Sequence, residues 1–253
     1  MLNIDLNCDI GESTSIWPYS IDHDLALLPH FSSINIACGF HAGDPDTILQ
    51  LLKAAAPLKI AVGAHPSLPD RENFGRKEKY STDEELYRII YQQIEFVASL
   101  AISNGIRIHH VKPHGALYNM ISRDHHMAFI VCSAIQAYDP DLAVYGLAGS
   151  EFTRVADNLG MRTYNEGFAD RTYQDDGTLT PRSAPNAVIE DAVQALEQAV
   201  QIAMKRTVTS VTGQTIPVNA ETICIHSDGR YALTFAKIIR EALLQHGIEI
   251  CQP

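Results

Sequence analysis

Hydrophobic and polar positions along this chain follow two alternating periods, and the alternation repeats throughout its length. Residues 2, 4 and 6 are apolar with polar residues between them, which is the period of a half-buried strand. Similar short runs, rich in apolar and β-branched residues, recur along the chain. The segments expected to be strands are 2–7, 33–37, 59–64, 107–112, 142–147, 162–168 and 221–226.

Between these runs the apolar positions change to helical spacing. Asp44 followed by Pro45 is a helix start, with an apolar face through Ile48, Leu52 and Ala55. A longer helix is expected to open at Ser81 or Thr82, each followed three residues later by a glutamate, and to stop at Asn104-Gly105. Further helices are expected near 125–138, 149–159, 185–206 and 230–245.

Strands that alternate with helices favour a parallel sheet or barrel with right-handed crossovers. Segment 207–219 breaks this rhythm, because it is β-branched around Thr212-Gly213-Gln214 and predicts an inserted β-hairpin. The length of 253 residues suits one α/β barrel-like domain, and no linker or repeat interrupts it. We therefore expect a single domain over 1–253.

Composition narrows the function classes. The net charge of -11 argues against a nucleic acid or an anionic membrane as partner. No apolar run reaches membrane length, and no basic-then-apolar leader precedes the first strand, so we expect a cytoplasmic protein. The cysteines form no CxxC pair, and those at 8, 38 and 224 are expected to be small buried residues.

The expected strands end in small polar clusters that contain glycine or proline. In a parallel sheet or barrel these ends lie on one rim, where such folds build their sites, so the sequence predicts an enzyme. In the first strand Asp5, Asn7 and Asp9 share one side, opposite Ile4 and Leu6. We interpret Asp5 and Asn7 as functional, because polar groups inside a strand need a reason; Asp9 and Glu12 could merely organise the turn.

Later strand ends add histidines and a lysine. His41 lies in a glycine-flanked loop, with Gly43, that leads into a helix and could receive an oxyanion or carboxylate on its backbone N–H groups. His65, which precedes Pro66, is a similar candidate. Lys112 and His114 flank Pro113, and a buried lysine needs an acidic partner, for which Asp5 or Glu166 is available.

The sixth and seventh strand ends carry the remaining candidates. Glu166, Asp170 and Arg171 combine acid and base, and Arg171 could hold a carboxylate by a forked pair of hydrogen bonds or simply pair with Asp170 within its loop. His226 ends the last strand. For His109 and His110 a hydrogen-bonded core position is the default interpretation. The chain has no GxxxxGK[ST], GxGxxG, GxSxG or HExxH motif.

Six long stretches, taken in order, resemble the LamB/YcsF family, whose members are A subunits of the bacterial ATP-dependent 5-oxoprolinase. They span nearly the whole chain: IDLNCDIGES at 4–13, NIACGFHAGDP at 35–45, VGAHPSLPDRENFGR at 62–76, HVKPHGALYN at 110–119, FADRTYQDDGTLTPR at 168–182 and ICIHSD at 223–228. Two positions depart from the usual pattern: Ser227 stands where glycine is usual, and Gly167 where valine is usual.

The resemblance implies a seven-stranded (β/α) barrel-like fold similar to the glycoside hydrolase/deacetylase superfamily. It implies a hydrolase that opens the lactam of 5-oxo-L-proline to L-glutamate, with ATP as cosubstrate (with Mg²⁺), in a complex with subunits B and C. No tightly bound metal is expected. In the roles that we assign on this basis, Asp5 and His114 form the acid–base or water-positioning pair and Lys112 stabilises negative charge on the opening ring. His41 and His65 line the pocket, and Arg171 or the loop at Gly43 receives the substrate carboxylate.

Two other functions stay open at this point. One is a metal-dependent deacetylase on the same barrel, with a ligand set such as Asp5, His41 and His65. The other is a non-catalytic regulatory subunit, which would leave the charged rim without a purpose.

Overall fold

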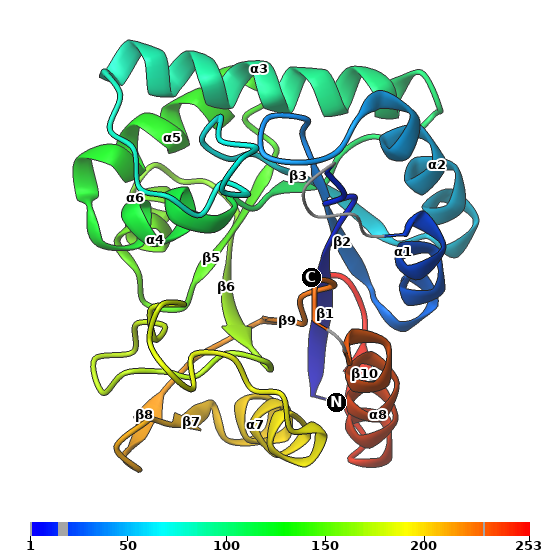
Figure 1. Cartoon of the computed structure of the whole chain (residues 1–253), viewed down its shortest axis with the longest axis vertical. Coiled ribbons are helices and arrows are strands. Elements are labelled where there is room, and N and C mark those ends of the chain that lie inside the picture. Colours follow the sequence, from blue (N-terminus) through cyan, green and yellow to red (C-terminus); the bar gives the residue numbers. More distant parts are fainter. Residues whose placement is uncertain (1, 15–19, 230) are drawn as a thin grey trace.

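A closed barrel of seven parallel strands forms the centre of the molecule (Figure 1). The computed structural model describes residues 2–14, 20–229 and 231–253. Closure follows from β1, which pairs in parallel with β2 on one side and with β9 on the other. In barrel order the strands are β1 (Asn3–Ile10), β2 (Ser33–Ala37), β3 (Ala61–His65), β4 (His110–Val111), β5 (Ala143–Leu147), β6 (Thr163–Phe168) and β9 (Thr222–Cys224). The seven expected strands and the barrel are confirmed.

Three further short strands lie outside the barrel. β7 (Thr207–Thr209) and β8 (Thr215–Pro217) pair antiparallel and confirm the inserted hairpin. β10 (Glu249–Ile250) pairs with the start of β1. This last strand was not expected, since two residues are too short to show a period.

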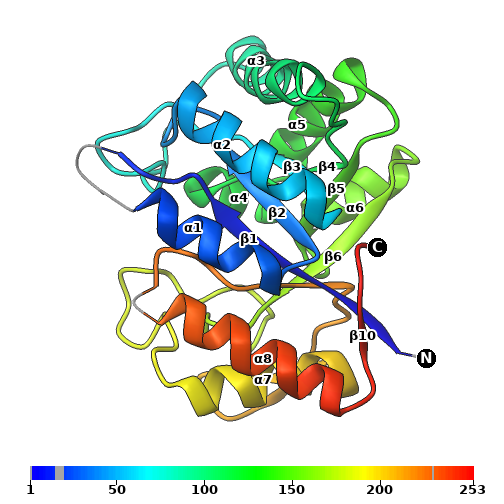
Figure 2. The ribbon, with the colours of Figure 1, turned by 90° about the vertical axis from the view of Figure 1, so that its right-hand side faces the viewer.

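Helices form the outer layer around the strands (Figures 1 and 2). They are α1 (Ile21–Leu27), α2 (Pro45–Ala55), α3 (Asp83–Ile102), α4 (Gly115–Arg123), α5 (His125–Tyr138), α6 (Glu151–Asn158), α7 (Ala192–Lys205) and α8 (Ala232–Gln245), with 3₁₀ turns at Leu28–His30 and Ala56–Leu58. None of these described helices is both long and apolar enough to cross a membrane.

The start signals of two helices act as expected. Asp44 caps α2, where its Oδ1 accepts a hydrogen bond of 2.9 Å from the Thr47 amide. Thr82, and not Ser81, begins α3 in a capping box with Glu85. Asp191 caps α7, so the expected start of that helix at 185 was wrong: Asn186 and its neighbours instead form an irregular loop that runs beside Arg171.

Two helices carry too little sequence signal to be expected. The short helix α1 has only two turns, and α4 begins directly at Gly115, a residue with φ of +59°. The sequence pattern assigns Pro113-His114-Gly115 to the end of a strand, whereas the structure starts a helix there. The consequence is that His114 occupies the N-cap position of α4, which fixes its place on the rim.

The inside of the barrel is polar and the space between barrel and helices is apolar. Along β1, Ile4, Leu6, Cys8 and Ile10 belong to the hydrophobic core. The alternate residues Asp5, Asn7 and Asp9 are buried and hydrogen-bond across the barrel interior. The alternation expected for this strand is therefore confirmed, and it explains how the barrel acquires a charged interior.

Candidate active site at the carboxyl ends of the barrel strands

An ion-pair cluster around Lys112 lies inside the barrel, toward the carboxyl ends of its strands. The Lys112 ammonium lies 2.9 Å from Asp9 Oδ1 and 2.7 Å from Glu166 Oε1, and its side chain is only 2% exposed. It also approaches Asn7 Oδ1 and Cys224 Sγ, both at 3.1 Å. Burial by itself lowers the pKa of Lys112, but its acidic neighbours, Asp9 first, outweigh it and raise the pKa well above its usual value.

This cluster changes the role expected for Lys112. All of its donors face protein acceptors, so it holds two carboxylates in place and is not directed at a ligand. Of the two acidic partners that the sequence offered, Glu166 is correct. Glu166 is fully buried, and its second oxygen accepts a hydrogen bond of 2.7 Å from the Tyr118 hydroxyl.

A second cluster contains Glu12 and three histidines. Glu12 Oε1 lies 2.9 Å from His114 Nδ1, 3.4 Å from His41 Nε2 and 3.6 Å from His65 Nε2. His65 Nε2 and His114 Nδ1 are 3.0 Å apart. The ring of His41 stacks on that of His114 with their centroids 4.0 Å apart.

Burial controls protonation in this cluster. It lowers the pKa of His41 to about 3 and that of His65 to about 4, so both imidazoles are neutral near pH 7. For Glu12 burial raises the pKa, but the neighbouring His114 and His41 outweigh it and the pKa falls well below its usual value. A charged carboxylate thus lies beside the neutral rings of His41 and His65.

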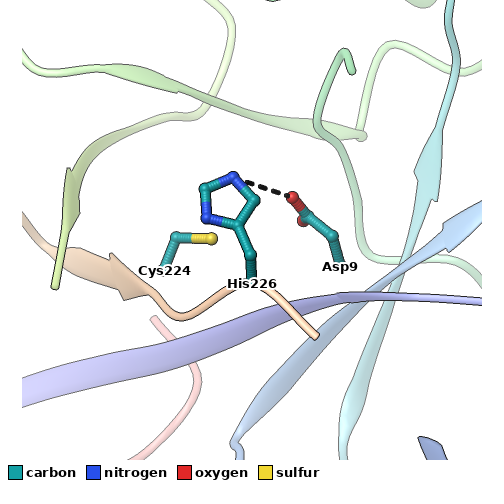
Figure 3. Close-up of side chains that lie close together, drawn as sticks. All are labelled: Asp9, Cys224 and His226. Atoms are coloured by element: carbon teal, nitrogen blue, oxygen red, sulfur yellow. Dashed lines mark ion pairs between the residues drawn. The ribbon is translucent and has the colours of Figure 1, made fainter. Parts of the chain in front are cut away.

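His226 stands at the more open side of the rim. Its Nδ1 hydrogen-bonds Asp170 at 2.9 Å, and its backbone N–H donates to the same carboxylate. Its Nε2 faces Asp9 Oδ2 at 3.9 Å, as Figure 3 shows. Because the Asp170 carboxylate accepts a hydrogen bond from Nδ1–H, the imidazole presents Nε2 to the rim in a fixed orientation.

Asp5 does not take part in the rim, contrary to the role expected from the sequence. Asp5 lies four residues before Asp9, about 13 Å along an extended strand. Its carboxylate accepts hydrogen bonds from the hydroxyls of Ser32, Ser33 and Thr222 at 2.6–2.7 Å. The expected Asp5–His114 pair is therefore wrong, and so is the alternative metal set of Asp5, His41 and His65.

The two groups expected to bind the substrate carboxylate are also engaged elsewhere. Arg171 donates from Nε and Nη2 to the carbonyls of Ala187 and Thr180, so its fork holds the loop. The Gly43 amide donates to the Ser13 carbonyl. The structure therefore directs the Arg171 side chain and the Gly43 amide to protein carbonyls, which sequence spacing does not reveal.

Several residues of the site escaped the sequence analysis. Asp9 and Glu12 belonged to the first polar cluster but were left with a turn-organising role as the alternative and were not assigned to the site, although Asp9 carries the same alternation signal as Asp5. Arg76 and Arg182 come from separate loops and meet at Asp228: Arg76 forms an ion pair with it, and Arg182 Nη1 lies 3.8 Å away. No local pattern marks this pair. His110, by contrast, is the expected core histidine, bonded to Asn35 at 2.7 Å.

The barrel defines the class of protein first. Among solved structures, the family 4 carbohydrate esterase from Streptomyces lividans has a similar fold, with a TM-score of 0.50 and 11% identity over 98% of this chain and 91% of that chain. The seven-stranded barrel thus resembles the fold of this carbohydrate esterase, as the sequence led us to expect.

Within this class the assignment is specific. The profile of the LamB/YcsF family matches residues 4–253, and the chain belongs to that family. The A subunit of 5-oxoprolinase from Tolumonas auensis is 46% identical over 99% of this chain and 99% of that protein. The crystal structure of a lactam utilization protein from Thermus thermophilus superposes with a TM-score of 0.90, at 38% identity over 99% of both chains.

Proposed function

We propose that this chain is the A subunit of an ATP-dependent 5-oxoprolinase, which opens the lactam of 5-oxo-L-proline to L-glutamate. The observation that carries the proposal is the single rim on which Asp9, Glu12, His114 and His226 converge, in a chain with full-length similarity to proteins of that name. Opening an unstrained lactam requires a base to direct water and an acid to protonate the leaving nitrogen, and the rim offers both.

In this mechanism Glu12 and His114 position the attacking water. The water oxygen bonds to the lactam carbonyl carbon while the Glu12–His114 pair accepts the proton that the water loses, and the ring C–N bond then breaks. His226 donates the proton that the leaving nitrogen requires, and Asp170 keeps its ring in the orientation for this transfer. Lys112 acts as a positioning residue, because its ammonium fixes the Asp9 carboxylate that faces the His226 imidazole.

For the substrate carboxylate we now favour Arg182. Its side chain is 29% exposed at the rim and its distance to Asp228 is longer than that of Arg76, so its donors are the more available. The chain has no phosphate loop, and we assign much of the ATP handling to the partner subunits B and C. Since ATP is the cosubstrate, we expect the complex to work in the cytoplasm.

The test is reconstitution. The chain, purified with B and C subunits, is expected to form glutamate from 5-oxo-L-proline only when ATP is present. His226→Asn should lower kcat by about 10²–10⁴ without loss of complex assembly, because it removes the general acid. Arg182→Gln should mainly raise KM, and Arg154→Gln, at an exposed position on α6, is the matched control.

Two results would contradict the proposal. Absence of glutamate with all three subunits and ATP would remove the activity itself. Full turnover by both His226→Asn and Glu12→Gln would instead assign the chain a regulatory role within an active complex.

A further inference from the structure

Two groups of metal-ligand side chains lie on the rim within the described residues. One contains Asp9, Cys224 and His226, drawn in Figure 3. The other contains Glu12, His41 and His114. The two groups differ in one decisive respect, namely whether a cation already balances the acidic group.

The first group has its cation. The Lys112 ammonium lies 2.9 Å from Asp9 Oδ1 and 3.1 Å from Cys224 Sγ. A divalent ion placed among the same ligands would meet a buried positive charge at close range, which is strongly unfavourable. This group is therefore an ion-pair site and carries no metal.

Among the described residues no such cation pairs with the second group, and His65 adjoins it, with Nε2 3.0 Å from His114 Nδ1. Hydrogen bonds to backbone carbonyls fix one proton on His65 and one on His114. His65 Nδ1 lies 2.6 Å from the Lys112 carbonyl, and His114 Nε2 lies 2.9 Å from the Phe74 carbonyl. A carbonyl only accepts, so His65 Nδ1 and His114 Nε2 each carry a proton. His65 Nε2 and His114 Nδ1 are therefore the ring nitrogens left to act as ligands.

These two nitrogens face one another and a carboxylate. His65 Nε2 and His114 Nδ1 are 3.0 Å apart, with Glu12 Oε1 at 3.6 Å from the first and 2.9 Å from the second. Glu12 Oε1 is buried and has no hydrogen-bond partner among the described residues. Two imidazole nitrogens and a buried carboxylate oxygen that converge in this way are a typical ligand set for a metal ion.

The spacing of the three atoms fits a metal ion. Nitrogen and oxygen ligands about 2.0–2.1 Å from a tetrahedral Zn²⁺ lie about 3.3–3.4 Å from each other. The three measured separations, 2.9, 3.0 and 3.6 Å, lie on both sides of that value. The rings of His65 and His114 are nearly perpendicular, at 81°, so that both can direct an in-plane lone pair to one point.

We propose that Glu12 Oε1, His65 Nε2 and His114 Nδ1 bind a divalent transition-metal ion, Zn²⁺ in the first place. The backbone carbonyls behind His65 and His114 hold both rings in the ligating tautomer. His41 lines the open fourth position; its ring lies parallel to His114, so the two rings do not direct lone pairs to the same point. This inference departs from the sequence expectation of no tightly bound metal.

X-ray absorption on the intact chain, loaded with Zn²⁺ and freed of excess, tests the site without any substitution. We expect about one ion per chain and only nitrogen and oxygen neighbours near 2.0–2.1 Å. A sulfur neighbour near 2.3 Å would place the ion at Cys224 and overturn the proposal. If the chain binds no stoichiometric Zn²⁺ at micromolar concentration, the proposal is also overturned. That result would indicate that a proton shared among the three atoms takes the place of the metal.

Variants give a second readout. Glu12→Gln should weaken Zn²⁺ affinity by about 100-fold or more, measured by competition with a chromophoric chelator, because it removes the charged ligand. His226→Asn, in the other group, should leave Zn²⁺ affinity unchanged. Equal affinity of Glu12→Gln and the unsubstituted chain would refute the site. Metal content is measured apart from turnover, so failure of the proposed lactam hydrolysis would not affect this result.

Discussion

Replacing Lys112 by methionine tests how the barrel interior tolerates its charges. The substitution removes the ammonium that lies within 3 Å of both Asp9 Oδ1 and Glu166 Oε1, and it retains the length of the side chain. Breaking a buried ion pair by removing one partner costs about 3–5 kcal/mol, because the remaining charge is left buried and uncompensated. With two carboxylates left, we expect the upper end of this range.

The size of this loss matters because domains of this kind are stable by only about 5–15 kcal/mol. Urea unfolding at pH 7, followed by circular dichroism, measures the difference directly. Lys237→Met changes the same residue type at an exposed position of α8 and is the control, with an expected effect below about 0.5 kcal/mol.

A double variant separates charge from packing. In Lys112→Met/Glu166→Gln one of the two stranded carboxylates is neutral, and the amide can still interact with the Tyr118 hydroxyl. We expect it to recover a substantial part of the lost stability. A Lys112→Met protein within about 1 kcal/mol of the unsubstituted chain, or a double variant less stable than the single one, would refute this account of the interior.

Three further predictions concern other parts of the barrel. Gly63→Ala should destabilise the protein by about 1–3 kcal/mol, because the new Cβ would lie 2.2 Å from the buried His110 ring. Gly229→Ala is the control, because its new Cβ would have its nearest neighbour at 4.0 Å. Equal unfolding midpoints for the Gly63→Ala variant and the unsubstituted chain would contradict this prediction. Burial raises the pKa of Asp24 from 3.8 to about 6, so the native state binds the extra proton and the protein loses stability as pH rises from 4 to 6. Asp24→Asn can still accept the hydrogen bond from the Gly11 amide, and it should gain up to about 3 kcal/mol of stability relative to the unsubstituted chain as pH rises over that range. A stability difference between the two proteins that does not change with pH in urea unfolding would disprove this prediction. Asp5→Asn should lower stability by about 1–3 kcal/mol, because an amide offers only one acceptor oxygen to three hydroxyl donors, and the folded fraction should still form glutamate; loss of turnover without loss of stability would return Asp5 to the catalytic set.

The sequence by itself determined the elements and the faces of this protein. A period of two in residues 2–7 and Asp44 before Pro45 are both local signals in the sequence. A hydrogen bond from the Thr47 amide, three residues away, realises the second signal. The barrel, the inserted hairpin and the side of β1 that turns inward followed from such signals. The short elements α1 and β10 did not, because they span too few residues to show a period, and α4 did not, because its start at Gly115 was assigned to the end of a strand.

Only the tertiary structure decided which inward residues lie at the same level and what each one contacts. Asp5 and Asp9 carry the same signal, yet strand register places one among hydroxyls and the other beside Lys112. Arg171 turns into its loop, while Arg76 and Arg182 meet at Asp228 from separate segments. Closure of the barrel brings together groups more than a hundred residues apart, and the burial that results sets their charges; neither effect is encoded in local spacing.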